Sequence, residues 1–224
     1  MIQETLRKNR LFSGVSEEDM QEILPLFEER ECKEDEHIFL EGEKSDKLYL
    51  ACQGRVKIVK HTAEGKDVIL EIISPPDVFG GVAVLDGRAY PASAQAMEKC
   101  VVASITRKRF LELVDRYHVI AVESSMYFGE RLRNAYDMLR SISVERVERR
   151  IAALLIKFGE RVGKKQGDCT VMELGLTMQE IAEMVGTTVE TTIRTMNKFK
   201  REGLVAYGKG PMVLSPKLWE RQGE

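Results

Sequence analysis

The sequence predicts an α+β protein with a β-rich N-terminal half, one long central helix and a helical C-terminal part. Three observations predict this class. From Glu36 to Ile105, short apolar runs alternate with turn residues about every 8 to 12 residues, as in antiparallel barrels and sandwiches. From Arg107 onward, the apolar residues follow helical spacing. Near the C-terminus, a glycine separates two short helical patterns, which is typical of a helix-turn-helix.

Length and composition indicate a folded protein of two modest domains. The chain has 224 residues, of which 43% are hydrophobic and 31% are charged, as is ordinary for globular proteins. No run of about 18 apolar residues occurs, and the N-terminal segment lacks the apolar core of a signal peptide. We therefore expect a cytoplasmic protein without a membrane partner.

The charge is unevenly distributed along the chain. Residues 1–139 have a net charge of −6, whereas residues 140–224 have a net charge of +4. A basic C-terminal part favours contact with a polyanion in that region.

The cysteines and histidines are too scattered to form a metal site. There is no C-x-x-C pair and no H-x-H or H-E-x-x-H motif. We expect buried free thiols, with a redox role for one of them as the alternative, at Cys32, Cys52, Cys100 and Cys169. Ordinary surface or core histidines are expected at His37, His61 and His118. No metal ligand and no catalytic residue is predicted, which disfavours a metal-dependent β-barrel enzyme.

The β-rich half is expected to follow a short helix. Ser16 and Asp19 form the capping pattern that begins this helix. Strands bounded by Gly, Pro, Asp and Ser are then expected at 37–40, 47–52, 55–61, 67–73, 92–96 and 100–105.

A long helix is expected over residues 118–142. Its apolar residues recur at intervals of three and four, close to a heptad pattern. They are Val119, Val122, Met126, Gly129, Leu132, Tyr136 and Leu139. Such a stripe either packs on the β-rich half or pairs with the same helix of a second copy. Because the stripe is narrow and lies between two domains, we favour a parallel helix pair in a homodimer.

The domain boundary is expected at residues 141–143. Ser143 is expected to cap the next helix, whose apolar face includes Ile151 and Phe158. This divides the chain into a β-rich domain (1–117), a dimerisation helix and hinge (118–142) and a C-terminal domain (143–224). Residues 163–175 are rich in Gly and Lys and are expected to form an exposed loop.

The C-terminal domain contains the helix-turn-helix pattern. Thr177 and Glu180 form a capping box that begins the first helix. The small residue Ala182 lies four positions before Gly186, a turn residue that tolerates a positive φ, and Thr188 can cap the second helix. Two short strands around Gly208–Gly210 are expected to form a hairpin wing.

The second helix is expected to have two faces. Thr192, Met196 and Phe199 form the inward face, and Leu204 follows them. The opposite face, at the end of the helix that enters the major groove in such proteins, contains Val189, Glu190, Ile193 and Arg194.

The residues of this outer face suit base recognition. Arg194 can donate two hydrogen bonds to guanine, Glu190 can accept one from cytosine, and the aliphatic side chains can contact thymine methyl groups. Taken alone, a glutamate and an arginine four residues apart form a weak surface pair, and the surrounding pattern favours the DNA interpretation. Phosphate contacts are expected from Thr177, Thr188, Thr191, Lys198, Lys200, Arg201 and Lys209.

Four stretches together resemble the Crp/Fnr family of bacterial transcription regulators: 41–58, 75–96, the long helix and 176–194. The resemblance extends over nearly the whole chain. It implies a cyclic-nucleotide-binding-like double-stranded β-roll, a dimerisation helix and a winged helix-turn-helix, in a homodimer that binds palindromic DNA and contacts RNA polymerase. Val189, Glu190 and Arg194 match family positions that read bases, which implies a half-site around TGA, whereas Ile193 replaces the usual Gly or Ser.

The resemblance also implies an effector pocket in the β-roll, formed by Phe79, Gly80, Gly81, Tyr90, Pro91 and Ala92. Family members that bind cyclic AMP hold its ribose with a glutamate and its phosphate with an arginine, and here those positions are Gly81 and Pro91. A buried phosphate without a cation is strongly unfavourable, so cyclic AMP is not expected. No cysteine precedes Cys32, which also disfavours the iron-sulfur subtype. Haem, nitric oxide or a small apolar or aromatic molecule remains as the effector, with the three histidines as candidate haem ligands.

The sequence thus predicts a homodimeric transcription regulator in which the β-roll senses a small molecule or gas and the C-terminal domain reads DNA. The alternative is a β-roll regulatory subunit that acts through protein contacts only.

Overall fold

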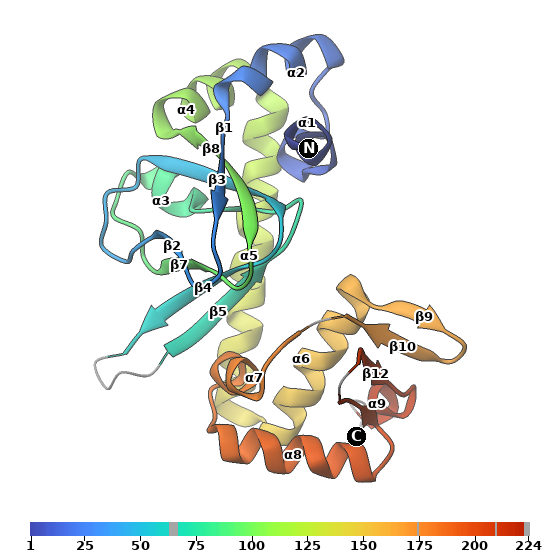
Figure 1. Cartoon of the computed structure of the whole chain (residues 1–224). Coiled ribbons are helices and arrows are strands. Elements are labelled where there is room, and N and C mark those ends of the chain that lie inside the picture. The colour runs from blue at the N-terminus through green and yellow to red at the C-terminus, as the bar shows by residue number, and fades with distance from the viewer. Residues whose placement is uncertain (63–66, 174, 209, 222–224) are drawn as a thin grey trace. The chain divides into compact units, whose positions relative to one another are not determined.

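The structure, a computed structural model, describes residues 1–62, 67–173, 175–208 and 210–221 (Figure 1). It divides into two compact units, Met1–Asn134 and Ala135–Glu224. The division falls within one helix, α5 (His118–Val144). The predicted α+β class, with an antiparallel β-domain, a long helix and a C-terminal helix-turn-helix, is confirmed.

Short helices precede the sheets of the first unit. They are α1 (Ile2–Lys8), η1 (Arg10–Phe12), α2 (Glu17–Ile23) and η2 (Leu24–Leu26). Ser16 caps α2 as predicted, and its hydroxyl accepts a hydrogen bond from the Asp19 N–H at 3.1 Å. The sequence did not predict α1, because Met1 supplies no capping side chain to mark its beginning.

The strands of the first unit form two four-stranded antiparallel sheets. One sheet has the order β1-β8-β3-β6 and the other the order β2-β7-β4-β5. The strands are β1 (Glu28–Cys32), β2 (His37–Phe39), β3 (Lys47–Gln53), β4 (Val56–His61), β5 (Asp67–Ile73), β6 (Val78–Phe79), β7 (Ser93–Ala96) and β8 (Cys100–Thr106). All six predicted strands are present. β1 and β6 were missed because β1 is almost entirely polar and exposed and β6 has two residues.

Alternation along β3 and β8 separates two hydrophobic cores. Successive side chains of a strand point to opposite faces of its sheet. Leu48 and Leu50 of β3 therefore join Ala103 of β8 in a core with the short helices and α5. Their neighbours Ala51 and Val102 lie in the second core, which contains residues of both sheets.

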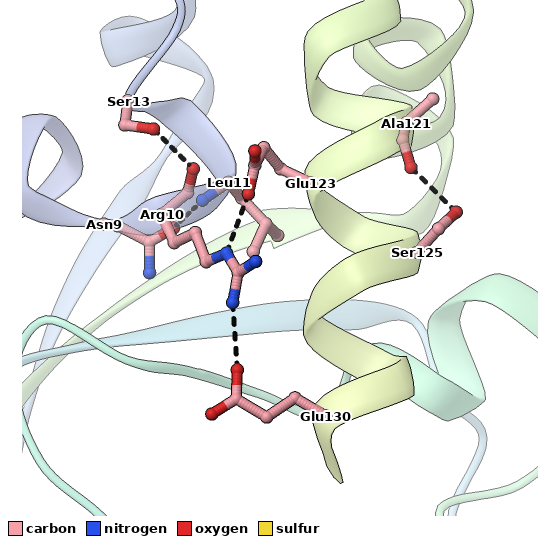
Figure 2. A network of polar contacts seen from close by, with 8 residues as sticks. All are labelled: Asn9, Arg10, Leu11, Ser13, Ala121, Glu123, Ser125 and Glu130. Carbon is pink, nitrogen blue, oxygen red and sulfur yellow. Dashed lines mark hydrogen bonds and ion pairs between the residues drawn. The ribbon is translucent and has the colours of Figure 1, made fainter. Parts of the chain in front are cut away.

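The N-terminal segment is tied to α5 by ion pairs (Figure 2). Arg10 Nε donates to Glu123 at 2.8 Å, and Arg10 Nη1 donates to Glu130 at 2.9 Å. Asn9 caps η1, the short helix that contains Arg10, and its side chain accepts a hydrogen bond from the Leu11 N–H at 2.9 Å. One guanidinium therefore holds two carboxylates seven residues apart on α5.

Helices follow β6 and β8 in the first unit. α3 (Gly81–Asp86) lies between β6 and β7, and α4 (Arg107–Arg116) begins at the residue where the sequence predicted the change to helix. The predicted end of the long helix was wrong, because α5 continues to Val144. Ser143 lies inside α5 and donates to the Leu139 carbonyl at 2.8 Å, so it does not cap the next helix.

The second unit packs helices on a small antiparallel sheet. Its helices are α6 (Val147–Val162), α7 (Met178–Val185), α8 (Val189–Arg201) and α9 (Lys217–Glu220). Its sheet has the order β11-β12-β10-β9, formed by β9 (Lys164–Gln166), β10 (Cys169–Met172), β11 (Val205–Ala206) and β12 (Met212–Leu214). The antiparallel pair β11 and β12 confirms the predicted C-terminal hairpin.

Residues 163–175 were predicted to form an exposed loop, and residues 164–168 are exposed, but the prediction of a loop was wrong. The segment contains the β9–β10 hairpin, and Val171 of β10 pairs with Val213 of β12. A Cβ on Gly163 would lie 2.3 Å from the Gly159 carbonyl oxygen and 2.3 Å from Thr170 Cγ2. The glycine that suggested a loop is therefore required for close packing between α6 and this hairpin.

We expect Phe199→Ala to lower the free energy of unfolding of the second unit by about 3 to 5 kcal/mol, because Phe199 is 0% exposed. Trp219 is the single tryptophan of the chain and lies in this unit, so its fluorescence in urea reports this unfolding. Arg201→Ala at an exposed position of the same helix should change stability by less than about 0.5 kcal/mol. A loss below about 1 kcal/mol for Phe199→Ala would contradict the packing.

Candidate functional site

The helix-turn-helix of the second unit consists of α7, a turn at Gly186, and α8. Both halves of the predicted capping box are present: the Glu180 N–H donates to the Thr177 hydroxyl at 3.1 Å, and the Thr177 N–H donates to the Glu180 carboxylate at 2.7 Å. Gly186 has φ 66°, in the left-handed region that favours glycine, and its N–H donates to the Ala182 carbonyl. Thr188 caps α8 by accepting from the Thr191 N–H at 3.2 Å.

One face of α8 is buried and the other is exposed. Thr192, Met196 and Phe199 are buried, as predicted, and Thr195 is buried beside them. Leu204 after the helix is also buried. The burial of this face fixes which residues of α8 face water.

The four residues predicted to read bases lie at the N-terminal end of α8. Glu190 and Arg194 are exposed, Ile193 is 43% exposed, and Val189 is half-buried. Within the described part of the chain, the Glu190 and Arg194 side chains form no hydrogen bond or ion pair, including with each other. Their polar atoms are therefore available to an external partner.

The predicted phosphate-binding residues differ in their availability. Lys198 Nζ contacts both carboxylate oxygens of Glu148 on α6 at 2.9 Å. Lys200 Nζ donates to the Tyr207 carbonyl at 3.1 Å and lies 5.0 Å from the centre of the Tyr207 ring. Arg201 is exposed. Lys209 lies outside the described residues.

The three threonines predicted to bind phosphate have local hydrogen bonds. Thr177 and Thr188 accept from backbone amides at the starts of α7 and α8, and the Thr188 hydroxyl donates to the Thr191 hydroxyl at 3.0 Å. All three hydroxyls therefore lie at helix N-termini, where the positive end of the helix dipole favours anions.

Two further residues at this surface were not predicted. Asn197 is exposed and lies three residues after Arg194, on the same face of α8. Its side-chain oxygen accepts from the Tyr207 hydroxyl at 3.1 Å. Helical spacing alone identifies Asn197, but Tyr207 follows β11 and reaches α8 only through the tertiary fold.

The first unit contains a cavity of about 90 Å³, lined by residues of its β-sheet domain and of the first half of α5. All six residues of the predicted effector pocket line it: Phe79, Gly80, Gly81, Tyr90, Pro91 and Ala92. Further lining residues that the sequence did not indicate include Phe39, Tyr127, Phe128 and Arg131. Three of these belong to α5, so only the tertiary structure brings them to the cavity.

The polar groups around the cavity are bound mostly to the protein itself. Tyr90 donates to the Lys47 carbonyl at 2.6 Å, and Tyr127 donates to the Val78 carbonyl at 2.8 Å. Arg131 pairs with Glu71 at 2.8 Å, and its guanidinium lies 4.6 Å from the Tyr127 ring centre. Burial raises the pKa of both tyrosines above the ordinary value, which is itself above neutral pH, so both phenols are protonated.

The cavity does not suit haem. None of the three histidines is among its lining residues, and all three are exposed. The cavity volume of about 90 Å³ is also far below the roughly 300 to 1,000 Å³ of typical small-molecule and cofactor sites, so haem would not fit in it. In the described residues, no group of three or more His, Cys, Asp or Glu side chains could hold a metal ion.

The predicted dimerisation residues lie along α5. Those of the first unit include Val122, Met126 and Leu132, which are 41%, 50% and 53% exposed. Tyr136 and Leu139, in the second unit, are 61% and 62% exposed. Gly129 lies on an open part of the surface, since a Cβ added there would have no atom within 4 Å. Val119 differs, because it packs on the core of the first unit and against Gly14.

Comparison with known proteins identifies both parts of the chain. Residues 29–117 match the cyclic nucleotide-binding domain family, and residues 149–217 match the Crp-like helix-turn-helix domain family. A cyclic AMP receptor protein of Thermus thermophilus is 28% identical over 92% of this chain and 92% of its own length. The cAMP-activated global transcriptional regulator CRP of Pasteurella multocida is 30% identical over 75% of this chain and 81% of its own length.

Solved structures have the same fold. A CooA mutant from Carboxydothermus hydrogenoformans superposes with a TM-score of 0.81, with 24% identity and 96% of each chain covered. FixK2 from Bradyrhizobium japonicum superposes with a TM-score of 0.77, with 20% identity, over 87% of this chain and 96% of its own. Among the described residues, no helix is long and apolar enough to cross a membrane.

We expect Thr188→Ala to destabilise the second unit by about 1 kcal/mol, because the α8 N-terminus loses its capping acceptor. Thr187→Ala is the matched control, since Thr187 precedes the capping position. Urea unfolding followed by Trp219 fluorescence measures both. Equal losses for the two variants would contradict the assignment of Thr188 as the cap.

Proposed function

Because the chain belongs to the Crp/Fnr family of transcription regulators, we propose that it reads DNA sequence with α8, as a homodimer controlled by a small effector. The C-terminal domain is a DNA-binding helix-turn-helix of the Crp type. One observation supports the assignment of α8 most strongly. Glu190, Ile193 and Arg194 are exposed together on a helix whose opposite face is buried.

The exposed residues suit direct base readout in the major groove. Arg194 presents a planar guanidinium for the two acceptors of guanine, and Glu190 presents acceptors for the cytosine amino group. Ile193 and Val189 offer aliphatic surface to thymine methyl groups. We therefore propose half-sites built around TGA, with Ile193 influencing the neighbouring base pairs.

Phosphate contacts would position α8 on the duplex. Thr177, Thr188 and Thr191 lie at the starts of α7 and α8, where amides and hydroxyls can meet phosphate oxygens. Arg201 is exposed and Lys200 lies beside Tyr207. Lys198 is held by Glu148, so its contribution requires that this ion pair opens.

The exposed stripe on α5 supports a parallel homodimer. The first unit exposes Val122, Met126 and Leu132, and the second exposes Tyr136 and Leu139, all large apolar side chains at heptad-like spacing in the sequence. Val119 is excluded from this surface because it packs on its own unit. A two-fold dimer would bind a palindromic site whose half-sites lie about 34 Å apart. Contact with RNA polymerase follows from the same family assignment.

Cyclic AMP is a poor match for the cavity, although the names of several relatives include it. A glutamate side chain at position 81 would collide with Phe128, since a Cβ there lies 2.8 Å from Phe128 Cζ. Among the described residues that line the cavity, Arg131 is the single arginine, and it is already paired with Glu71. We propose a different small effector, and no role for haem or an iron-sulfur cluster.

A regulatory function without catalysis fits the relatives, which are named as transcription regulators and activators. A β-roll subunit that acts only through protein contacts would have no use for unpaired Glu190 and Arg194 on α8. DNA binding by the purified chain separates the two functions.

We expect Arg194→Ala to weaken binding to the preferred site by about 1 to 3 kcal/mol and to relax base preference at one position of each half-site. DNA selected from a random pool by the wild type, followed by gel shifts on single-base variants, measures both effects. Arg201→Ala is the control and should weaken all sequences uniformly. Unchanged base preference in Arg194→Ala would reject base readout by this residue.

We expect Glu148→Gln to strengthen DNA binding at low salt, because it releases Lys198 for a phosphate. The slope of log affinity against log salt concentration should become more negative by about 0.9, the value for one additional phosphate contact. The double variant Glu148→Gln/Lys198→Gln should return to the wild-type slope. Because Glu148 also contacts Arg221 at 3.4 Å, the double variant is needed to assign the change to Lys198. A slope that is insensitive to Glu148→Gln would contradict the proposal that Glu148 withholds Lys198 from phosphate.

A further inference from the structure

Asn197 lies in the middle of the exposed face of α8. Glu190, Arg194 and Asn197 follow one another at intervals of four and three residues, so they occupy one side of the helix in successive turns. All three are exposed. A rise of about 1.5 Å per residue places Asn197 roughly 4.5 Å beyond Arg194 along the helix axis, close to the spacing of about 3.4 Å between base pairs. With α8 in the major groove, Asn197 therefore faces a base pair next to the one that Arg194 contacts.

The side-chain amide of Asn197 is held on one side only. The Tyr207 hydroxyl donates a hydrogen bond to Asn197 Oδ1 at 3.1 Å. In the ranges that the structure describes, Asn197 Nδ2 has no hydrogen-bond partner. The amide therefore directs its oxygen to Tyr207 and leaves its NH₂ group, which carries two donors, available to a partner outside the chain.

Tyr207 is held beside α8 by Lys200. Lys200 Nζ donates to the Tyr207 carbonyl at 3.1 Å and lies 5.0 Å from the centre of the Tyr207 ring. An ammonium group at this distance is attracted to the face of an aromatic ring. The two contacts attach Tyr207 to the helix that carries Asn197, so its hydroxyl stays within reach of the amide.

An amide that offers only its NH₂ group distinguishes two kinds of base. In the major groove, guanine and thymine present an acceptor oxygen where adenine and cytosine present an amino group. A donor pairs with the oxygen and is opposed by the amino group. An asparagine that is free to rotate lacks this selectivity, because it can also direct its oxygen to an amino group, as in its pairing with adenine. A hydroxyl that holds the amide oxygen therefore changes which bases the side chain accepts.

Resting on the proposed function of α8, we propose that Asn197 reads one further base pair of each half-site as a hydrogen-bond donor, and that Tyr207 sets this specificity. On the strand that it faces, Asn197 favours guanine or thymine over adenine or cytosine. Tyr207 is a positioning residue, since it acts through Asn197. If the bond between them only held the end of α8 in place, its loss would affect stability, or affinity for all sequences alike, and would leave base preference unchanged.

DNA selection with the full chain tests the role of Asn197. The wild type selects duplexes from a random pool, and gel shifts on all single-base variants of the selected site give their relative affinities. We expect a position next to the one that Arg194→Ala relaxes to favour guanine or thymine by about three- to tenfold, as one hydrogen bond predicts. Asn197→Asp replaces the donor by an acceptor of the same shape, so the preference at this position alone should turn to adenine or cytosine.

Tyr207→Phe tests the positioning role, because it removes the hydroxyl and keeps the ring beside Lys200. The freed amide can present either edge, so the preference at the Asn197 position should fall below about twofold, whereas the Arg194 position keeps its preference. Trp219 fluorescence in urea verifies that the variant is folded. Tyr117→Phe is the matched control: it removes a hydroxyl that donates to Asp19 at 2.9 Å in the first unit, and it should change neither position.

Three results would overturn the proposal. The first is an unchanged set of base preferences in Asn197→Asp. The second is a weakening of all sequences alike by Asn197→Asp, which would identify a phosphate contact. The third is a preference at the Asn197 position that survives in folded Tyr207→Phe.

The same measurements separate this inference from the proposed function. If Arg194→Ala relaxes one position and Asn197→Asp alters none, the role of Asn197 is wrong and DNA readout by α8 stands. If the wild type selects no sequence at all, the proposed function fails and this inference fails with it.

Discussion

The proposed DNA-reading surface depends on the burial of one face of α8. Thr192, Met196 and Phe199 are each 0% exposed, and a helix that buries these positions must turn Glu190, Ile193 and Arg194 to solvent. The orientation is secured at both ends: Thr188 caps the N-terminus, and Tyr207 bonds to Asn197 near the C-terminal end. Loss of this packing would leave the same residues in the sequence but would remove their common direction. The proposed base recognition therefore depends on the packing of Thr192, Met196 and Phe199, which are buried and would not contact DNA themselves.

In the first unit, α5 is held from two sides. Arg10 bonds to Glu123 and Glu130, and Arg131 bonds to Glu71 of β5 and to the Val78 carbonyl. The cavity lies beside Arg131 and Phe128, so a ligand there changes the environment of the same helix that exposes the proposed dimer stripe. A ligand shifts a conformational equilibrium only through different affinity for its two states.

Local patterns predicted the helix-turn-helix in detail. The capping box at Thr177, the positive φ at Gly186 and the inward face of α8 follow from residue type and spacing alone, and the structure has all three. The failures have physical causes. Gly163 marks close packing and not a loop, Ser143 bonds within α5 and not at a cap, and β1 is too polar to be recognised without its partner β8. The α5 residues of the cavity and the Glu148–Lys198 pair involve long-range contacts, which no local pattern encodes.

Protection of Ile193 by DNA tests most directly whether α8 enters the duplex. Ile193 is 43% exposed, so hydroxyl radicals oxidise it in the free protein, and mass spectrometry measures the rate. With selected DNA bound, oxidation of Ile193 should fall severalfold, whereas Leu70, 44% exposed in the first unit, should react as before. An unchanged rate at Ile193 under conditions in which the DNA is fully bound would contradict insertion of α8 into the major groove.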